Sequence, residues 1–439
     1  MFEILLILSA GIFLFSLVYF DFDLLEPCVL VNSSLVFSIA IALSFADTWG
    51  YDVGIRATIY ILVAMIAFTF GDIFAKKEFG AISIKHHFET GIRYEVSFWK
   101  ILLALVAMGF MLNYNYNAIM DLAESLGYKY ERHLVNDIFD GNILEMLKTI
   151  RWEMEKNKLQ FIGRFVNYFT QISQTIAFIC IYLFAFNSIL ARFKWRDLKL
   201  LIPPIFYLPF MILSTGRISM LAFFIYILTV VAIVYYRKHG FNSQSHLKLM
   251  LYVPLVGFLF VCMFLLMGLV TGKTLMGDRT PFMILAHYAG TSIPAFSMIV
   301  DRIQPEDLLI GSHTLAGIYR VIQKFVFGLP DVQFFLPFVH FQGIDTNVFT
   351  ALGRYLLDYG FIGSVAIMWI FGFFYSFYYN RLKISGNVIA VVFYGYLSYP
   401  LLMFPMDDKI MLDFFSSTPF YEMFLLYVLS FVLIRTSRQ

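Results

Sequence analysis

The long apolar runs of this 439-residue chain restrict its fold more than any other feature. Many extend for about 18 residues or more, the length that crosses the roughly 30 Å hydrocarbon core of a bilayer. Only 14% of the residues are charged, which leaves too little polar surface to cover a water-soluble body of this size. Segments with the alternating pattern of barrel strands are absent, so the spans are expected to be helices. The sequence therefore predicts an all-α polytopic membrane protein.

The hydropathy pattern predicts eleven transmembrane helices in a single integral membrane domain, residues 1–439. The predicted spans are residues 2–20, 28–46, 57–75, 96–115, 161–190, 199–213, 217–236, 249–270, 348–379, 387–404 and 418–434. The N-terminus begins Met1-Phe2-Glu3, without a basic region or a clear cleavage site. We therefore interpret the first apolar run as a retained span rather than a signal peptide.

The basic residues of the short loops predict the orientation. They form five sets: Lys76, Lys77, Lys85 and Arg93; Arg192, Lys194, Arg196 and Lys199; Arg237, Lys238 and Lys248; Arg381 and Lys383; and Arg435 and Arg438. Eleven spans place all five sets on one side, which the positive-inside rule makes cytoplasmic. Two long segments, 116–160 and 271–347, then lie on the outer side. Loops of this length usually have a structure or function of their own.

Two stretches of these outer segments have helical periodicity. Residues 311–328 combine an apolar face with a basic stripe. The stripe follows the spacing i, i+4, i+7 and i+11 and consists of His313, Gly317, Arg320 and Lys324. Such a helix either lies in the lipid headgroup layer or cradles a phosphate-containing anion. Residues 142–158 predict a second amphipathic helix, which rests on the membrane or covers a cavity.

Two arginines stand at the outer ends of predicted spans. The same spacing recurs in Asn347, Ala351, Arg354 and Asp358. An arginine near hydrocarbon is costly unless it faces a partner or a wet cavity; the alternative is an Arg354–Asp358 ion pair within the helix. Arg217 follows a tight turn and begins a helix, where free backbone N–H groups favour an anion. A snorkelling side chain is the alternative there.

Further candidate residues lie in segment 271–347, namely Asp278, Arg279, His287, Arg302 and His340. The outer cations together run against the usual charge bias of membrane proteins. They are Arg217, Arg279, Arg302, Arg320, Lys324 and Arg354. The rigid fork of arginine suits phosphate better than lysine does. The collection predicts a polyanionic ligand.

Other classes of site find little support. The net charge of +2 does not favour nucleic acid, and no P-loop, zinc spacing or nucleophile elbow occurs. The three cysteines lie in apolar stretches, as packing residues do. Asp21-Phe22-Asp23 is similar to a nucleotide-sugar motif but falls in a short cytoplasmic turn, so we interpret it as a chance match. Asp407-Asp408 could bind a cation, but no further ligands are identifiable. We predict neither a metal nor a cofactor.

Four motifs resemble those of one family. The run Thr346-Asn347-Val348-Phe349-Thr350-Ala351-Leu352-Gly353-Arg354-Tyr355, followed by Asp358-Tyr359-Gly360, resembles the signature of bacterial oligosaccharide repeat unit polymerases, the Wzy family. Segments 214–217, 288–296 and 311–314 resemble its other motifs, in the same order. The resemblance covers roughly residues 160–400.

The resemblance implies a GT-C-like glycosyltransferase of the bacterial cytoplasmic membrane, with its site on the periplasmic or outer face. Such enzymes transfer a growing chain from undecaprenyl pyrophosphate to the next lipid-linked oligosaccharide, making O-antigen, capsule or exopolysaccharide. Membrane lipids surround them, and a chain-length regulator and a flippase act in the same pathway. Arg217, Arg279 and Arg354 are then expected to hold the pyrophosphate, with Arg302, Arg320 and Lys324 assisting. The candidate general bases are His287, His313, His340 and Asp358.

Three alternatives remain from the residues alone. A flippase or exporter of lipid-linked oligosaccharide would need charged groups along a path open to both faces. An O-antigen ligase would share the outer arginines but transfer to a lipid A core. A purely structural role would leave the outer arginines unexplained.

Overall fold

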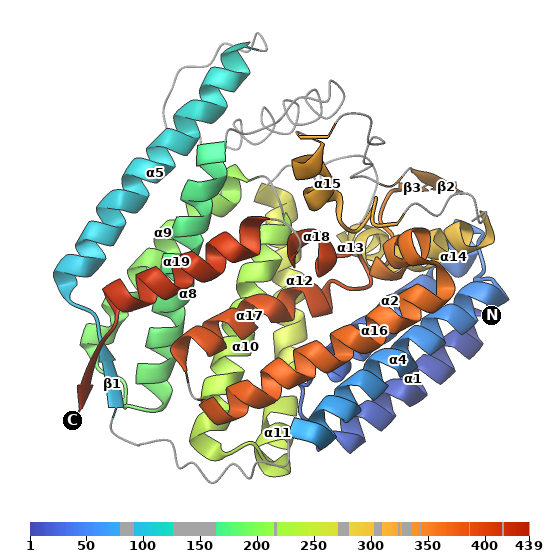
Figure 1. Cartoon of the computed structure of the whole chain (residues 1–439), viewed down its shortest axis with the longest axis horizontal. Helices are drawn as coiled ribbons and strands as arrows, with labels where there is room; N and C mark the ends of the chain where they lie inside the picture. Colours follow the sequence, from blue (N-terminus) through green and yellow to red (C-terminus); the bar gives the residue numbers. More distant parts are fainter. Residues whose placement is uncertain are drawn as a thin grey trace.

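The fold is almost entirely helical (Figure 1). The computed structural model describes residues 1–79, 92–125, 164–214, 217–270, 281–302, 310–323, 325–326, 336, 338–342, 344–385, 387–414 and 417–438. The predicted amphipathic helix at 142–158 lies outside the described residues, as does most of the outer segment 116–160.

Each predicted span coincides with a helix. These are α1 (Phe2–Tyr19), α2 (Pro27–Ser44), α4 (Ile55–Phe79), α5 (Phe98–Ser125), α8 (Arg164–Ile189), α9 (Ile202–Leu213), α10 (Arg217–His239), α12 (Val253–Val270), α16 (Ala351–Ser385), α17 (Val388–Leu402) and α19 (Ser417–Leu433). In the described chain, seven helices are long and apolar enough to cross a membrane, and eight if the bent pair of α11 (Ser243–Met250) and α12 forms one span. The α17 helix and the Tyr421–Leu433 part of α19 are shorter apolar helices. The predicted class, an all-α polytopic membrane protein, is confirmed.

Short elements occupy the two ends of the helical body (Figure 1). The helices are α3 (Ala46–Trp49), η1 (Trp195–Leu201), α13 (Pro281–Gly290), α14 (Ser292–Arg302), α15 (Ala316–Ile322) and α18 (Met411–Phe414). The strands are β1 (Ile92–Glu95), β2 (Val339–Phe341), β3 (Ile344–Thr346) and β4 (Arg435–Arg438). Strand β1 pairs antiparallel with β4, and β2 with β3. The first sheet joins the C-terminus to the α4–α5 connection, although about 340 residues separate the two strands.

The basic segments gather at one end, called here the basic end. Arg93 of β1 forms a buried ion pair with Asp197 of η1. Lys383, near the end of α16, lies 3.0 Å from carboxylate oxygens of both Asp23 and Glu26 in the α1–α2 connection. Figure 1 shows β1, α11 and the C-terminus along the same lower edge. The described basic segments therefore lie together at this end, and their place on one side of a membrane stays a prediction.

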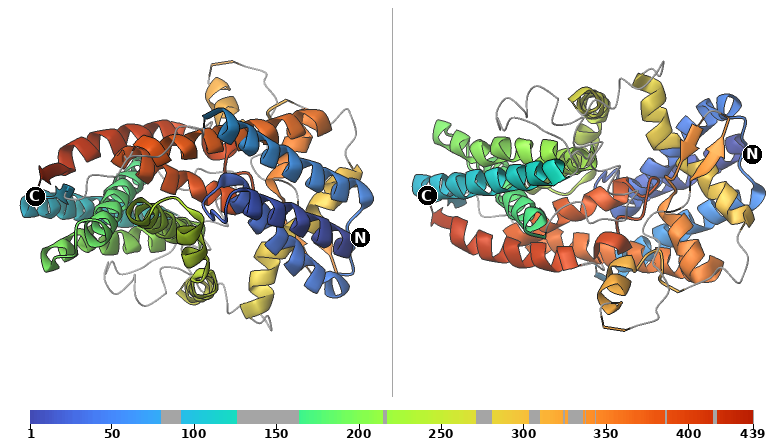
Figure 2. Two further views of the ribbon diagram at one scale, coloured as in Figure 1. Left: turned by 90° about the horizontal axis from the view of Figure 1, so that it is seen from below. Right: turned by 90° about the horizontal axis from the view of Figure 1, so that it is seen from above.

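Helices α4 and α16 contact each other through their backbones. A Cβ atom on Gly71 would lie 2.1 Å from the Trp369 carbonyl oxygen, and one on Gly372 would lie 2.1 Å from that of Phe68. Small residues at such a crossing allow the close packing typical of membrane helices. This pair belongs to a group that also contains α1 and α2, while α5, α8 and α9 form a second group (Figure 2). Helices α10 and α17 pack together between them.

Helix α16 is broken near its N-terminal end. Gly360 has φ 64° and ψ −175°, a combination that side chains exclude. The break separates a short segment, residues 351–359, from the long span that follows. The backbone N–H of Ala351 donates to the carbonyl of Phe404 at 3.0 Å, which fixes the start of this segment against the α17–α18 connection. The short segment carries the predicted site residues Arg354 and Asp358.

The prediction of one helix over residues 311–328 is wrong at its beginning. Residues 311–314 form a turn, and α15 covers only Ala316–Ile322. Gly311 has φ 78°, which is incompatible with a right-handed helix. His313 therefore lies in the turn and not on a stripe with Arg320.

Candidate functional site

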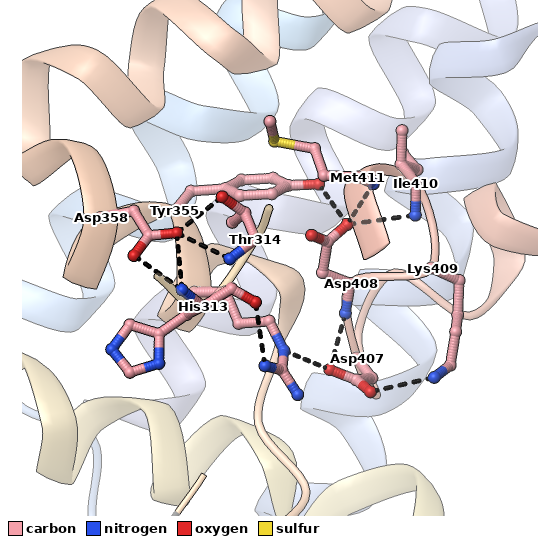
Figure 3. Close-up of polar contacts among 10 residues, drawn as sticks. His313, Thr314, Tyr355, Asp358, Asp407, Asp408, Lys409, Ile410 and Met411 are labelled. Atoms are coloured by element: carbon pink, nitrogen blue, oxygen red, sulfur yellow. Dashed lines mark hydrogen bonds and ion pairs between the residues drawn. The ribbon is translucent and has the colours of Figure 1, made fainter. Parts of the chain in front are cut away.

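Asp358, near the start of α16, binds the loop turn formed by residues 311–314 (Figure 3). Asp358 is buried, and its carboxylate accepts hydrogen bonds from the backbone N–H groups of His313 (3.0 Å) and Thr314 (2.7 Å). The hydroxyl groups of Thr314 (2.6 Å) and Ser312 (3.3 Å) also donate to it. Converging backbone amides of this kind form an anion site. The protein fills this one with its own carboxylate.

Arg354 binds the same turn from the opposite side. Its Nη1 atom donates to the carbonyl oxygen of His313 at 3.3 Å, and its Nε atom donates to Asp407 at 2.8 Å. The ion pair of Arg354 is therefore with Asp407, and the alternative of an Arg354–Asp358 pair is wrong. Both side chains lie on one face of the short segment, and they hold the His313 peptide from its N–H and its C=O side.

Asp407, in the α17–α18 connection, fixes the arginine. Lys409 also lies 3.1 Å from its carboxylate. Burial raises the pKa of Asp407, but the charges of Lys409 and Arg354 outweigh burial and hold the pKa below its ordinary value. Asp407 is therefore ionised at neutral pH, and the guanidinium group keeps a fixed counter-charge.

The pKa of Asp408 is shifted in the opposite direction from that of Asp407. It is fully buried, and its Oδ1 atom accepts hydrogen bonds from the Tyr355 hydroxyl (2.8 Å) and from the N–H groups of Ile410 (3.1 Å) and Met411 (2.9 Å). Burial raises its pKa to about 7. Asp407 and Asp408 accept hydrogen bonds from protein donors, whereas Oδ2 of Asp408 is buried without a hydrogen-bond partner among the described residues. No group of three His, Cys, Asp or Glu side chains in the described chain is placed to hold a metal ion; the absence of a metal stays a prediction.

The imidazole of His313 feels the charges of both Asp358 and Arg354. Its Nδ1 atom is buried and has no hydrogen-bond partner among the described residues. Burial lowers the pKa of His313 below its ordinary value, while the charges of Asp358 and Arg354 act in opposite directions. Figure 3 shows the ring pointing away from the Asp358 carboxylate. The imidazole is thus neutral at pH 7 and has a nitrogen that can accept a proton.

The other candidate bases lie elsewhere. His340 is 71% exposed and pairs with Asp345 (2.7 Å) across the β2–β3 hairpin. His287 lies on α13, where its ring contacts Tyr288 and its carbonyl accepts from Thr291. Asn347 is half-buried between β3 and α16. The contacts described for His340 and His287 are separate from those that hold His313, Arg354 and Asp358 together.

The remaining cations are only partly placed. Arg217 begins α10, Arg302 ends α14 and Arg320 lies in α15, but the structure describes their backbones alone. Asp278, Arg279 and Lys324 lie outside the described residues. Their assignment to a pyrophosphate site stays a prediction.

The structure adds Asp407 and Tyr355 to the contacts of Arg354 and Asp408, a role that the sequence did not predict for either residue. Tyr355 stood inside the recognised motif, but an aromatic residue in a span is ordinarily a packing residue. No local sequence pattern joins Asp407 to Arg354, because 53 residues separate the two.

Comparison of the chain with protein-family models, curated proteins and solved structures gave no match. The family resemblance therefore rests on the motifs themselves.

Proposed function

We propose that this protein is a membrane glycosyltransferase that polymerises undecaprenyl-pyrophosphate-linked oligosaccharide repeat units into O-antigen, capsule or exopolysaccharide. The observation that carries the proposal is a buried arginine, Arg354, fixed by Asp407 beside the peptide of a neutral histidine, His313. A cation and a proton acceptor side by side are what displacement at a sugar–phosphate bond requires.

In the proposed reaction, a hydroxyl oxygen of the acceptor attacks the anomeric carbon of the donor sugar. The bond between that carbon and the pyrophosphate oxygen breaks, and the pyrophosphate leaves with the electron pair. His313 accepts the proton of the attacking hydroxyl. Arg354 stabilises the negative charge that develops on the leaving group, with Arg217 and Arg279 as further candidate cations. Asp358 acts as a positioning residue, because it accepts hydrogen bonds from the turn that carries His313.

The proposal includes eleven spans and a GT-C-like arrangement, with the basic end in the cytoplasm. The site then faces the periplasm or the cell exterior, where nucleotide sugars are not available. A lipid-linked donor presents its pyrophosphate at that membrane surface. Of the alternatives, a flippase is disfavoured because the candidate cations concentrate at one end of the spans.

The direct test is reconstitution of the purified protein in liposomes with synthetic undecaprenyl-pyrophosphate repeat units, with and without a chelator. Wild type should form polymer in both conditions. Arg354→Ala, Arg354→Lys and His313→Asn should lower polymer formation by at least about 100-fold, the range of a lost charge-stabilising or acid–base group. Lysine should fail because it lacks the bidentate fork.

The matched control is Arg196→Ala, an exposed arginine at the basic end that pairs with Glu95; its polymer should have normal length. Normal polymer from both Arg354→Ala and His313→Asn would refute the assignment. Transfer to lipid A core without polymer would instead identify a ligase.

A further inference from the structure

A second group of buried ionisable side chains lies at the basic end, at the opposite end of α16 from the candidate site. It consists of Asp23 and Glu26 in the α1–α2 connection, Asp72 of α4, His246 of α11 and Lys383 of α16. Each is at most 9% exposed. The inference drawn from this cluster does not depend on the proposed function.

Two of the three carboxylates are paired with cations. Lys383 Nζ lies 3.0 Å from both Asp23 and Glu26, and 4.0 Å from the centroid of the Tyr379 ring. His246 Nε2 lies 3.8 Å from Asp23, while its Nδ1 contacts the Asp21 carbonyl at 2.8 Å. Lys383 and His246 are thus directed toward Asp23 and Glu26.

Asp72 has no such partner. Its Oδ2 atom accepts a hydrogen bond from the N–H of Cys28 at 2.8 Å, and the side chains of Ser376 and Cys28 also donate toward the carboxylate. Its Oδ1 atom is buried without a partner, as is Oε1 of Glu26, and the two carboxylates are close enough to repel each other. No Lys, Arg or His of the described chain lies within ion-pair distance of Asp72. A buried carboxylate in this situation takes up a proton, because burial of an unpaired charge costs far more free energy than burial of the neutral acid.

The charge count leads to the same result. The cluster contains three carboxylates but at most two positive charges, on Lys383 and on a protonated His246. One proton makes the cluster neutral. We propose that Asp72, with Glu26 as its neighbour, is a proton-binding site that is occupied at neutral pH.

The site lies at a close contact between two spans. Asp72 follows Gly71, and its backbone carbonyl accepts a hydrogen bond from Ser376 Oγ of α16 at 3.2 Å. Loss of the proton would leave a buried negative charge where α4 and α16 touch. The proton therefore allows the close α4–α16 contact.

The test is infrared spectroscopy of the full-length protein in lipid nanodiscs at pH 7, which detects the C=O stretch of protonated carboxyl groups. All proteins carry Asp408→Asn, because Asp408 titrates near pH 7 and would add its own band. The reference should show a buried carboxyl band that Asp72→Asn removes and Glu26→Gln shifts. The matched control Asp47→Asn, at an exposed carboxylate beyond the other end of α2, should leave the band unchanged.

Three results would overturn the proposal. The first is a reference spectrum without a protonated carboxyl band, or with a band that neither Asp72→Asn nor Glu26→Gln alters. The second is a band that disappears when sodium chloride is added, which would assign the site to a monovalent cation. The third is a clear fall in the melting temperature of Asp72→Asn, because an amide should replace a neutral acid with little loss.

Discussion

The residues around His313 form a network in which each charge has a defined partner. Asp358 accepts hydrogen bonds from the N–H groups of the turn, and Arg354 donates one to the carbonyl oxygen of His313. Asp407 forms an ion pair with Arg354. The result is a rigid setting for one imidazole. Removal of a single member should therefore affect both stability and the proposed reaction.

Asp358→Asn tests the turn. The amide keeps the size of the side chain but removes the charge and brings an N–H group against the donors of His313 and Thr314. We expect a loss of about 1–3 kcal/mol of stability, as for a buried hydrogen-bonded charge, and a marked fall in polymerisation. Thermal melting and the liposome assay measure the two effects. Asp345→Asn, at the exposed hairpin, should melt like wild type, and equal melting of both variants would contradict the role of Asp358.

Asp408 gives a prediction for the pH dependence of stability. Its pKa is raised to about 7 in the folded protein from an ordinary value of 3.8. The folded state therefore binds the proton more tightly, so its stability contribution is full below pH 3.8 and is lost as pH rises toward about 7. The melting temperature of wild type minus that of Asp408→Asn should fall across this window. The same difference for Asp407→Asn, whose pKa is lowered, should not fall.

At this scale the sequence predicted identities better than partners. Arg354, Asp358 and His313 were selected from spacing and motif, and the structure brings all three together. Their mutual contacts were not predictable, because the nearest alternative was a local Arg354–Asp358 pair. The true partner, Asp407, belongs to a connection that the fold alone brings to α16.

At the scale of elements, the break in α16 is decisive for the site. The hydropathy pattern predicted one long span and could not show the break, because an apolar run is continuous through Gly360. Only the positive φ of that glycine identifies it. In the same way, the helical spacing over 311–328 did not predict the turn at its start. That turn begins at Gly311, and hydrogen bonds from its backbone amides to Asp358 stabilise it. Hydrophobic periodicity predicts where helices lie, but it does not report local breaks.

Gly360→Ala tests the importance of the break. A Cβ at this φ and ψ costs about 1–3 kcal/mol, and relief by a straight helix would move Arg354 and Asp358 away from the turn. We expect a lower melting temperature and loss of polymer. Gly11→Ala is the matched control, since a Cβ there meets nothing within 4 Å, and it should melt at or above the wild-type temperature. Full activity of Gly360→Ala would show that the break does not position the site.

At the scale of the whole molecule, the two charged clusters occupy opposite ends of one helix. Arg354 and Asp358 lie near the start of α16, whereas Lys383 lies near its end beside Asp23 and Glu26. Between the two clusters, α4 packs against α16 at Gly71 and Gly372. The direction in which α16 crosses the membrane decides which substrates can reach the site.

Labelling of single cysteines measures that orientation. In a background without the three native cysteines, Asp47→Cys in α3 and Asp345→Cys in β3 place exposed thiols outside the basic end, and Arg196→Cys in η1 and Lys248→Cys in α11 place them at it. With the basic end in the cytoplasm, a membrane-impermeant maleimide should label only the first pair in intact spheroplasts, and all four after permeabilisation. Labelling of only the second pair would reverse the axis. The site would then face the cytoplasm, where nucleotide sugars are available, and a lipid-pyrophosphate donor would lose its physical rationale.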